Sequence, residues 1–263
     1  MTVFDSIFLG IVQGLTEFLP ISSSGHLVVT QALLGVTDHN VLFEVMLHCA
    51  TLLAILLFFR KQIYELKAQK IVLLLVAFVP AGLVGFFFND LIVESYSNVL
   101  LVALSLLVSG VINFMISREL KLHSLGKKAE KPEKTTLTYR SALTIGLYQM
   151  IALIPGVTRS GSTVLGGLKQ ELSRIKAFEF SFLMAIPVIL GASANELAKL
   201  ETFSLAEIDE LVFGIGFLSA FVVGLGSLWL LRAMINRAKF EYFAVYCWLA
   251  GTSLLIFHFA GAI

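Results

Sequence analysis

Long apolar stretches dominate the chain and alternate with short polar connections. A helix needs about 20 predominantly apolar residues to cross the hydrocarbon core of a membrane. Six stretches meet this length, and we place the spans at 41–59, 71–88, 97–117, 176–198, 208–231 and 241–261. The pattern predicts an all-α polytopic membrane protein with about six transmembrane helices.

Two further apolar stretches, 7–19 and 143–154, are too short to span a membrane. Each of them stops at a proline, Pro20 or Pro155, and is followed by a turn rich in hydroxyl groups and glycine. Irregular backbone at membrane depth is tolerated only where protein or a water-filled cavity surrounds it. We therefore expect two re-entrant helical hairpins, at 3–35 and 141–172.

The two hairpins resemble each other at an offset of 136 residues. Three pairs carry the resemblance: Gly10 with Gly146, Gln13 with Gln149, and Ser24-Gly25 with Ser160-Gly161. Three spans lie between the hairpins, so they would enter the membrane from opposite sides. This arrangement is an inverted-topology repeat, which places a site near the midplane where the repeats meet. We predict a first repeat over 1–117, a cytoplasmic linker over 118–140 and a second repeat over 141–263.

The basic residues predict the orientation. All but two of the 19 lysines and arginines fall in connections that alternate to one side of the predicted membrane, the exceptions being Arg159 and Lys199. Because cytoplasmic connections carry an excess of basic residues, this side is expected to be cytoplasmic. Both termini would then lie outside.

Composition narrows the function classes. Hydrophobic residues make up 57% of the chain and charged residues 14%, whereas soluble domains carry roughly a quarter charged residues. The net charge of +1 and the lack of a basic arm give no indication of nucleic-acid binding. The two cysteines, Cys49 and Cys247, have no metal-type spacing and are interpreted as packing residues.

The first hairpin carries a carboxylate at membrane depth. Gln13 and Glu17 are four residues apart and share one face of the entering helix. An ionisable group inside a membrane costs about 2.5–3.5 kcal/mol on insertion scales and marks a functional site by default. A solvated helix end is the alternative interpretation for either residue.

The turn that follows has the composition of an anion site. It reads Ser22, Ser23, Ser24, Gly25 and His26, directly before the returning helix. Hydroxyl groups and a titratable imidazole at a helix start suit a phosphate group. The alternative is a polar turn that caps the helix, but a cap needs only one hydroxyl.

The second turn adds a permanent cation to further hydroxyl groups. Its residues are Thr158, Arg159, Ser160, Gly161, Ser162 and Thr163. The planar guanidinium of Arg159 matches phosphate oxygens in a bidentate manner. The alternative is a structural arginine that pairs with Glu17 or Glu179. His48 and His258 are interpreted as packing residues, and Glu44 fits a structural or a functional role equally.

At these residues the sequence resembles the undecaprenyl-diphosphate phosphatase family of bacteria, also called the bacitracin-resistance family. The first family motif reads Gln13-Gly-Leu-Thr-Glu17 and continues to His26; the second reads Pro155-Gly-Val-Thr-Arg-Ser-Gly-Ser-Thr163. The run from Phe178 to Pro187 is also similar. Many members have Glu where this chain has Gln13, and Thr158 stands where Ser is usual.

The resemblance implies a hydrolase of the bacterial inner membrane that removes the terminal phosphate of undecaprenyl diphosphate on the outer, periplasmic face. By position, Glu17, Ser23, His26 and Arg159 match the key residues of the family, with the remaining turn residues around the substrate. The family uses a divalent cation, Mg or Ca, for which Glu17 and Gln13 are the candidate ligands. The expected partners are the polyprenyl diphosphate and membrane lipid, and a homodimer is a further expectation.

Two chemical routes and a rival function remain open. Ser23 could attack the terminal phosphorus while Glu17 or His26 takes its proton, or one of these two groups could activate a water. The rival is a transporter or flippase for a polyprenyl phosphate, because inverted repeats are also a transporter architecture. A purely structural membrane subunit would leave Arg159 unexplained.

Overall fold

The computed structural model describes residues 1–36, 41–96, 98–124, 137–199 and 209–261, which form helices and turns without a strand. Six of the helices in this part of the chain are long and apolar enough to cross a membrane. They are α3 (Val41–Phe58), α5 (Ala68–Phe87), α7 (Val99–Ser124), α10 (Arg174–Ala198), α11 (Glu210–Asn236) and α12 (Glu241–Phe259). The predicted all-α polytopic membrane fold is confirmed.

Several spans are longer than the apolar pattern predicts. The helix α7 continues to Ser124 instead of 117, and α11 continues to Asn236 instead of 231. The apolar stretches end where charged residues begin, but Arg, Glu and Lys are good helix formers and do not end a helix. Consequently α7 enters the predicted linker 118–140, whose residues 125–136 lie outside the described part of the chain.

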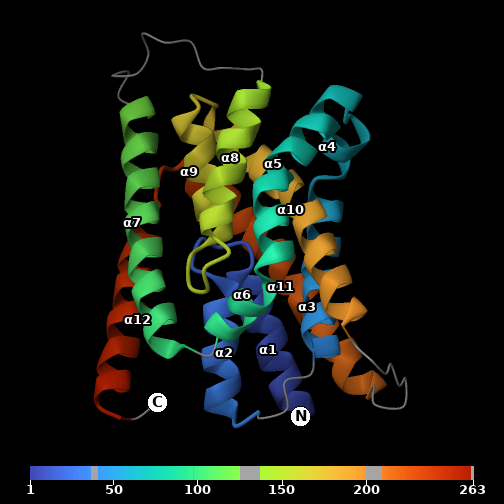
Figure 1. Ribbon diagram of the computed structural model, residues 1–263, viewed down its shortest axis with the longest axis vertical. Helices are drawn as coiled ribbons and strands as arrows, with labels where there is room; N and C mark the ends of the chain where they lie inside the picture. Colours follow the sequence, from blue (N-terminus) through green and yellow to red (C-terminus); the bar gives the residue numbers. More distant parts are fainter. Residues whose placement is uncertain (37–40, 97, 125–136, 200–208, 262–263) are drawn as a thin grey trace.

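The remaining helices are short. Two pairs form the hairpins, α1 (Val3–Thr16) with α2 (Ser23–Leu34) and α8 (Tyr139–Ile151) with α9 (Arg159–Lys169). Two others, α4 (Arg60–Tyr64) and α6 (Asn89–Ser95), connect the long helices. In Figure 1, α1 and α2 lie at the lower end of the molecule, α8 and α9 enter from the upper end, and their turns meet in the middle. The inverted repeat and the re-entrant insertion stay predictions.

Prolines explain where the entering helices stop. Helix α1 ends at Thr16, four residues before Pro20, and α8 ends at Ile151, four residues before Pro155. Proline has no N–H for the carbonyl four residues earlier, and its ring clashes with that carbonyl. The same local rule therefore breaks both hairpins at the same place in the motif.

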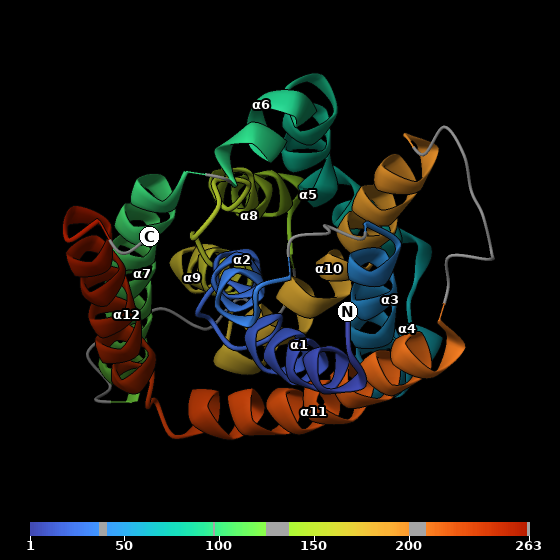
Figure 2. The ribbon, with the colours of Figure 1, turned by 90° about the horizontal axis from the view of Figure 1, so that it is seen from below.

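Each hairpin packs on a long helix from the other half of the chain. Figure 2 shows α1 along α11, and α8 beside α5. A Cβ at Gly10 would lie 2.6 Å from the carbonyl oxygen of Gly216, and one at Gly146 would overlap the carbonyl oxygen of Ala77. The predicted repeats are thus interleaved, with corresponding glycines permitting the close helix contacts.

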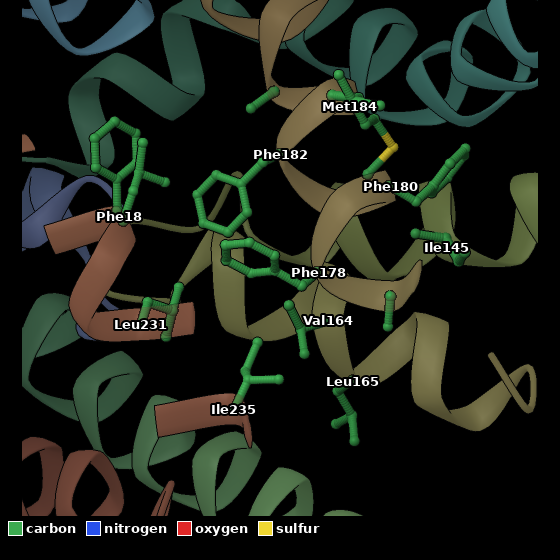
Figure 3. Close-up of a cluster of buried hydrophobic side chains, with 14 of the residues drawn as sticks. Phe18, Ile145, Val164, Leu165, Phe178, Phe180, Phe182, Met184, Leu231 and Ile235 are labelled. Atoms are coloured by element: carbon green, nitrogen blue, oxygen red, sulfur yellow. The ribbon is translucent and has the colours of Figure 1, made fainter. Parts of the chain in front are cut away.

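A buried aromatic cluster fixes the first turn against α10 (Figure 3). The ring of Phe18 lies 5.7 Å from that of Phe182, which in turn lies 4.9 Å from Phe178. All three side chains are fully buried, and Val164 of α9 and Leu231 of α11 belong to the same cluster. Since Phe18 directly follows Glu17, this packing holds the carboxylate next to α9 and α10.

Candidate active site

A single carboxylate connects the two turns. Glu17 directly follows α1, and its Oε1 accepts a hydrogen bond from Nη2 of Arg159 at 2.5 Å. Its Oε2 accepts a hydrogen bond from the hydroxyl of Ser23 at 2.9 Å. The side chains of Glu17 and Arg159 are only 7% and 15% exposed. Three residues that the sequence singles out therefore meet around one buried carboxylate.

Two further side chains lie beside the same carboxylate. Nε2 of Gln13 donates to Oε2 of Glu17 at 3.3 Å, as their spacing on α1 allows. Nε2 of His48 on α3 lies 3.9 Å from that oxygen, while its Nδ1 lies 2.8 Å from the carbonyl oxygen of Glu44. Sequence reasoning took His48 for a packing residue and missed this contact. Its one signal is an imidazole in a largely apolar span that also carries Glu44.

The serine turn is held in an unusual backbone conformation. Ser22 has φ 72° and ψ 104°, in the left-handed half of the Ramachandran plot that side chains rarely adopt. Such conformations cost on the order of 1–3 kcal/mol and gather at functional sites. Ser22 makes no side-chain cap with α2; its hydroxyl lies 3.4 Å from that of Ser24. The capping interpretation of this turn therefore has no support in the hydrogen bonds.

His26 faces away from Glu17. Its Nδ1 donates to the carbonyl oxygen of Ser22 at 2.7 Å, which leaves Nε2 to accept from the hydroxyl of Tyr246 on α12 at 2.7 Å. The pair lines a groove of about 430 Å³ between α1, α2 and α12. The structure therefore does not bring His26 together with the Glu17 carboxylate.

Most hydroxyl groups of the second turn are engaged within their own helix. The Thr158 hydroxyl caps α9 by accepting from the amide of Gly161, and Ser162 and Thr163 donate to carbonyl oxygens one turn earlier. Ser160 has its hydroxyl 3.3 Å from that of Thr158. These groups shape the turn, and Arg159 is the side chain that reaches across it.

Gly25 and Tyr96 also belong to this region. A Cβ at Gly25 would lie 3.1 Å from the side chain of Val102, which is tighter than ordinary contact, so glycine permits the first turn to lie close to α7. Tyr96 follows α6, and burial raises the pKa of its hydroxyl. Sequence reasoning did not single out Tyr96.

Arg159 keeps one unused donor. Nη1 is buried and has no hydrogen-bond partner in the described part of the chain, while Nη2 is bound to Glu17. Its guanidinium carbon lies 5.9 Å from the ring centre of Phe182. Glu179, the other partner considered from the sequence, pairs with Lys176 instead. A buried donor without a partner calls for a ligand, and an anion suits a guanidinium.

The side chains of Gln13 and Glu17 decide whether this site could hold a metal ion. Among the described residues, no group of three His, Cys, Asp or Glu side chains could hold a metal ion. Oε1 of Gln13 is buried and without a partner next to Glu17. Mg²⁺ is commonly bound by one or two carboxylates together with substrate phosphates. Gln13 and Glu17 therefore fit a cation shared with a phosphate ligand.

Known proteins are similar to this chain over almost its whole length. The family model described as bacitracin resistance protein BacA matches residues 6–253. A protein of Thermosipho africanus named undecaprenyl-diphosphatase is 42% identical over 92% of this chain and 95% of its own length. Proteins of the same name from Halothermothrix orenii and Methanococcus vannielii are each 37% identical, over 97% and 96% of this chain and 98% and 99% of their own.

Proposed function

The chain belongs to the bacitracin resistance protein BacA family, and on this premise we propose that it removes the terminal phosphate of undecaprenyl diphosphate. The observation that carries the proposal is the continuous contact from the Ser23 hydroxyl through Glu17 to Arg159. It joins a nucleophile, a proton acceptor and an anion-binding cation around the buried Glu17 carboxylate. The names of the relatives favour this enzyme over the transporter alternative.

In the proposed reaction, the Ser23 oxygen attacks the terminal phosphorus. The new bond joins this oxygen to phosphorus, the bond to the bridging oxygen breaks, and undecaprenyl phosphate leaves. The Ser23 proton passes to Oε2 of Glu17, which lies 2.9 Å away. Glu17 passes this proton to the phosphate of the departing undecaprenyl phosphate. Water then attacks the phosphorus of the phosphoserine, the bond from phosphorus to the Ser23 oxygen breaks, one water proton goes to that oxygen, and inorganic phosphate leaves. Glu17 is favoured over His26 as the acceptor because His26 contacts Ser22 and Tyr246 instead.

The ion pair with Arg159 makes Glu17 a weak base, since a nearby cation favours the ionised carboxylate. Phosphoryl transfer tolerates this, because its loose transition state needs little activation of the nucleophile and depends on positioning and charge neutralisation. Arg159 supplies both: Nη2 orients Glu17, and the unpartnered Nη1 is free for a phosphate oxygen.

We further propose that Glu17 and Gln13 would hold Mg²⁺ or Ca²⁺ next to the diphosphate. When bound, the cation would neutralise charge on the phosphate oxygens. Removing divalent ions with a chelator should stop phosphate release by the purified protein, and added Mg²⁺ or Ca²⁺ should restore it. Full activity after chelation would contradict this part of the proposal.

The protein is a multi-pass membrane protein, and we propose the bacterial inner membrane as its location. The orientation expected from the basic residues would place the end of the molecule with α4 in the cytoplasm. The start of α1 and the end of α12 would lie outside (Figure 1). The site would then be open to the outer, periplasmic face. The polyprenyl chain would lie in the groove beside His26, which Val12, Leu15 and Leu19 also line. The expected homodimer stays a prediction that a mass measurement in detergent tests.

Phosphate release from undecaprenyl diphosphate by the purified protein in detergent tests the proposed function. Glu17→Gln keeps the size of the side chain but removes the proton acceptor and the charge that binds Arg159. We expect turnover to fall by at least about 10²-fold, the lower range for general base catalysis. A transporter cleaves no phosphate bond, and the assay in detergent has no sealed bilayer across which transport could occur. Failure of the wild-type protein to release phosphate in detergent would therefore refute the proposed enzyme activity.

A further inference from the structure

The two turns share a support that is not part of either hairpin. We propose that Ser109 and Asn113 of α7 are positioning residues that set the spacing between the turns, so that Glu17 meets Arg159. The inference rests on the proposed function for its kinetic readout, but not for its geometry.

Ser109 holds the second turn by two hydrogen bonds. Its hydroxyl donates to the carbonyl oxygen of Gly156 at 2.8 Å and accepts from the backbone N–H of Thr158 at 2.9 Å. The side chain is fully buried. These bonds clamp the backbone directly before Arg159 onto α7.

Asn113 holds the first turn in the corresponding way. Its Nδ2 donates to the carbonyl oxygen of Pro20 at 2.6 Å, and the side chain is fully buried. Pro20 lies three residues after Glu17 and three residues before Ser23. One amide therefore fixes the middle of the segment that carries both the carboxylate and the serine.

The spacing of Ser109 and Asn113 along α7 means that the two contacts together set the distance between the turns. Residues four apart in a helix share a face and are about 6 Å apart along its axis. Ser109 and Asn113 thus attach the two turns to one rigid face at a fixed separation. The Glu17–Arg159 ion pair closes the ring on the other side. A misplacement of about 1 Å in such a constellation can cost on the order of 10²-fold in rate.

The same helix provides a matched control. Ser117 lies on α7 and donates a hydrogen bond of 2.6 Å to Glu241 of α12, away from both turns. Ser109→Ala and Ser117→Ala therefore remove the same kind of hydroxyl group from one helix; the first deletes two buried hydrogen bonds and the second one part-buried hydrogen bond. Any general weakening of α7 should appear in both variants.

The experiment compares Ser109→Ala, Asn113→Leu and Ser117→Ala in phosphate release, thermal stability and amide hydrogen exchange. We expect Asn113→Leu to lose about 10²-fold in kcat, because it frees the turn that carries Ser23. Ser109→Ala should raise KM as well, because it frees the turn that carries Arg159. Ser117→Ala should stay within about threefold of the wild type. Ser109→Thr keeps the hydroxyl and should recover most of the lost activity.

Hydrogen exchange separates the two proposals, because it needs no activity. Exchange should rise at 156–161 in Ser109→Ala and at 18–23 in Asn113→Leu, and at neither segment in Ser117→Ala. If the wild type released no phosphate but this pattern appeared, the proposed function would fail and the positioning role would stand. If Ser109→Ala and Asn113→Leu matched Ser117→Ala in kinetics and exchange, the positioning role would be overturned. Loss of the fold in Ser109→Ala with an inactive but folded Ser109→Thr would overturn it too.

Discussion

At the residue scale, the site is built around one buried negative charge. Burying a carboxylate is costly unless it is paired and hydrogen-bonded. Glu17 meets this condition with Arg159 on one oxygen and with Ser23 and Gln13 on the other. Its partners come from both hairpins, so the charge is compensated only when the turns are together. The stability of the site and its chemistry therefore depend on the same contacts.

The three serines of the first turn separate a covalent mechanism from a water attack. Ser23→Ala should fall far below Ser22→Ala and Ser24→Ala, because losing one donor costs about 10²–10³-fold in turnover, whereas a nucleophile cannot be replaced. Adding Glu17→Ala to Ser23→Ala should cost little more. Phosphate release by the purified variants measures this. Equal, modest losses in all three serine variants would instead favour attack by water, with the serines as a phosphate cradle.

The second residue-scale prediction concerns Arg159. Arg159→Lys keeps the charge but loses the planar fork, so one group can no longer bind Glu17 and a phosphate oxygen in the present geometry. We expect a loss of at least about 10²-fold in turnover by a folded protein, comparable to losing one oxyanion donor. Phosphate release together with the melting temperature in detergent checks this. Turnover near that of the wild type would mean that the role of Arg159 is structural.

At the element scale, the hairpins depend on close backbone contacts with the long helices. Gly10 of α1 faces α11, and Gly146 of α8 faces α5, where any side chain would meet backbone atoms. Close approach of helices through small residues is the usual basis of packing in membranes, where burial of apolar surface gives little driving force. Glycines on the outer faces of the hairpins therefore allow the close packing that holds the polar turns inside the molecule.

The glycine contacts predict an asymmetric effect of one added methyl group. Gly10→Ala should destabilise the protein by about 1–3 kcal/mol, the usual cost of overpacking, because its Cβ would lie 2.6 Å from the Gly216 carbonyl oxygen. Gly226→Ala on α11 is the control, since the space around that position is open. Helix propensity should make the control neutral or slightly stabilising. Equal melting temperatures for the two variants in detergent would contradict the close contact.

At the scale of the whole molecule, function depends on which end faces the cytoplasm. In Figure 1, α4, which carries Arg60 and Lys61, lies at one end of the molecule, and α1 begins at the opposite end. By the positive-inside rule the end with α4 is expected to face the cytoplasm, and the proposed outward opening of the site depends on this expectation.

Cysteine labelling in intact cells tests the orientation. The background is a variant whose Cys49 and Cys247 are replaced by alanine. In it, Asp90→Cys in the first turn of α6 should react with an impermeant reagent from outside. Glu65→Cys, just after α4, should react only after permeabilisation. Both residues are exposed, so access depends on the side of the membrane alone. The reverse pattern would overturn the orientation and the outward-facing site.

The sequence by itself determined the features that local chemistry controls. Six spans follow from the length and hydropathy of each stretch, and the breaks of α1 and α8 follow from Pro20 and Pro155. It also singled out Glu17 and Arg159, because ionisable groups are rare at membrane depth. The choice of Ser23 among the three serines came from the family resemblance. Pairing of Arg159 with Glu17 could be named as one alternative, but the choice over Glu179 could not be made.

Only the tertiary structure decided which side chains meet. His26, expected at the site, turns toward Tyr246 of α12, whereas His48 of α3, expected to be a packing residue, reaches Glu17. The support of both turns by Ser109 and Asn113 could not be read from α7, which is an ordinary apolar span in the sequence. The physical reason is common to all of these. Periodicity fixes the face of a helix on which a residue lies, whereas packing of helices distant in the chain decides what that face contacts.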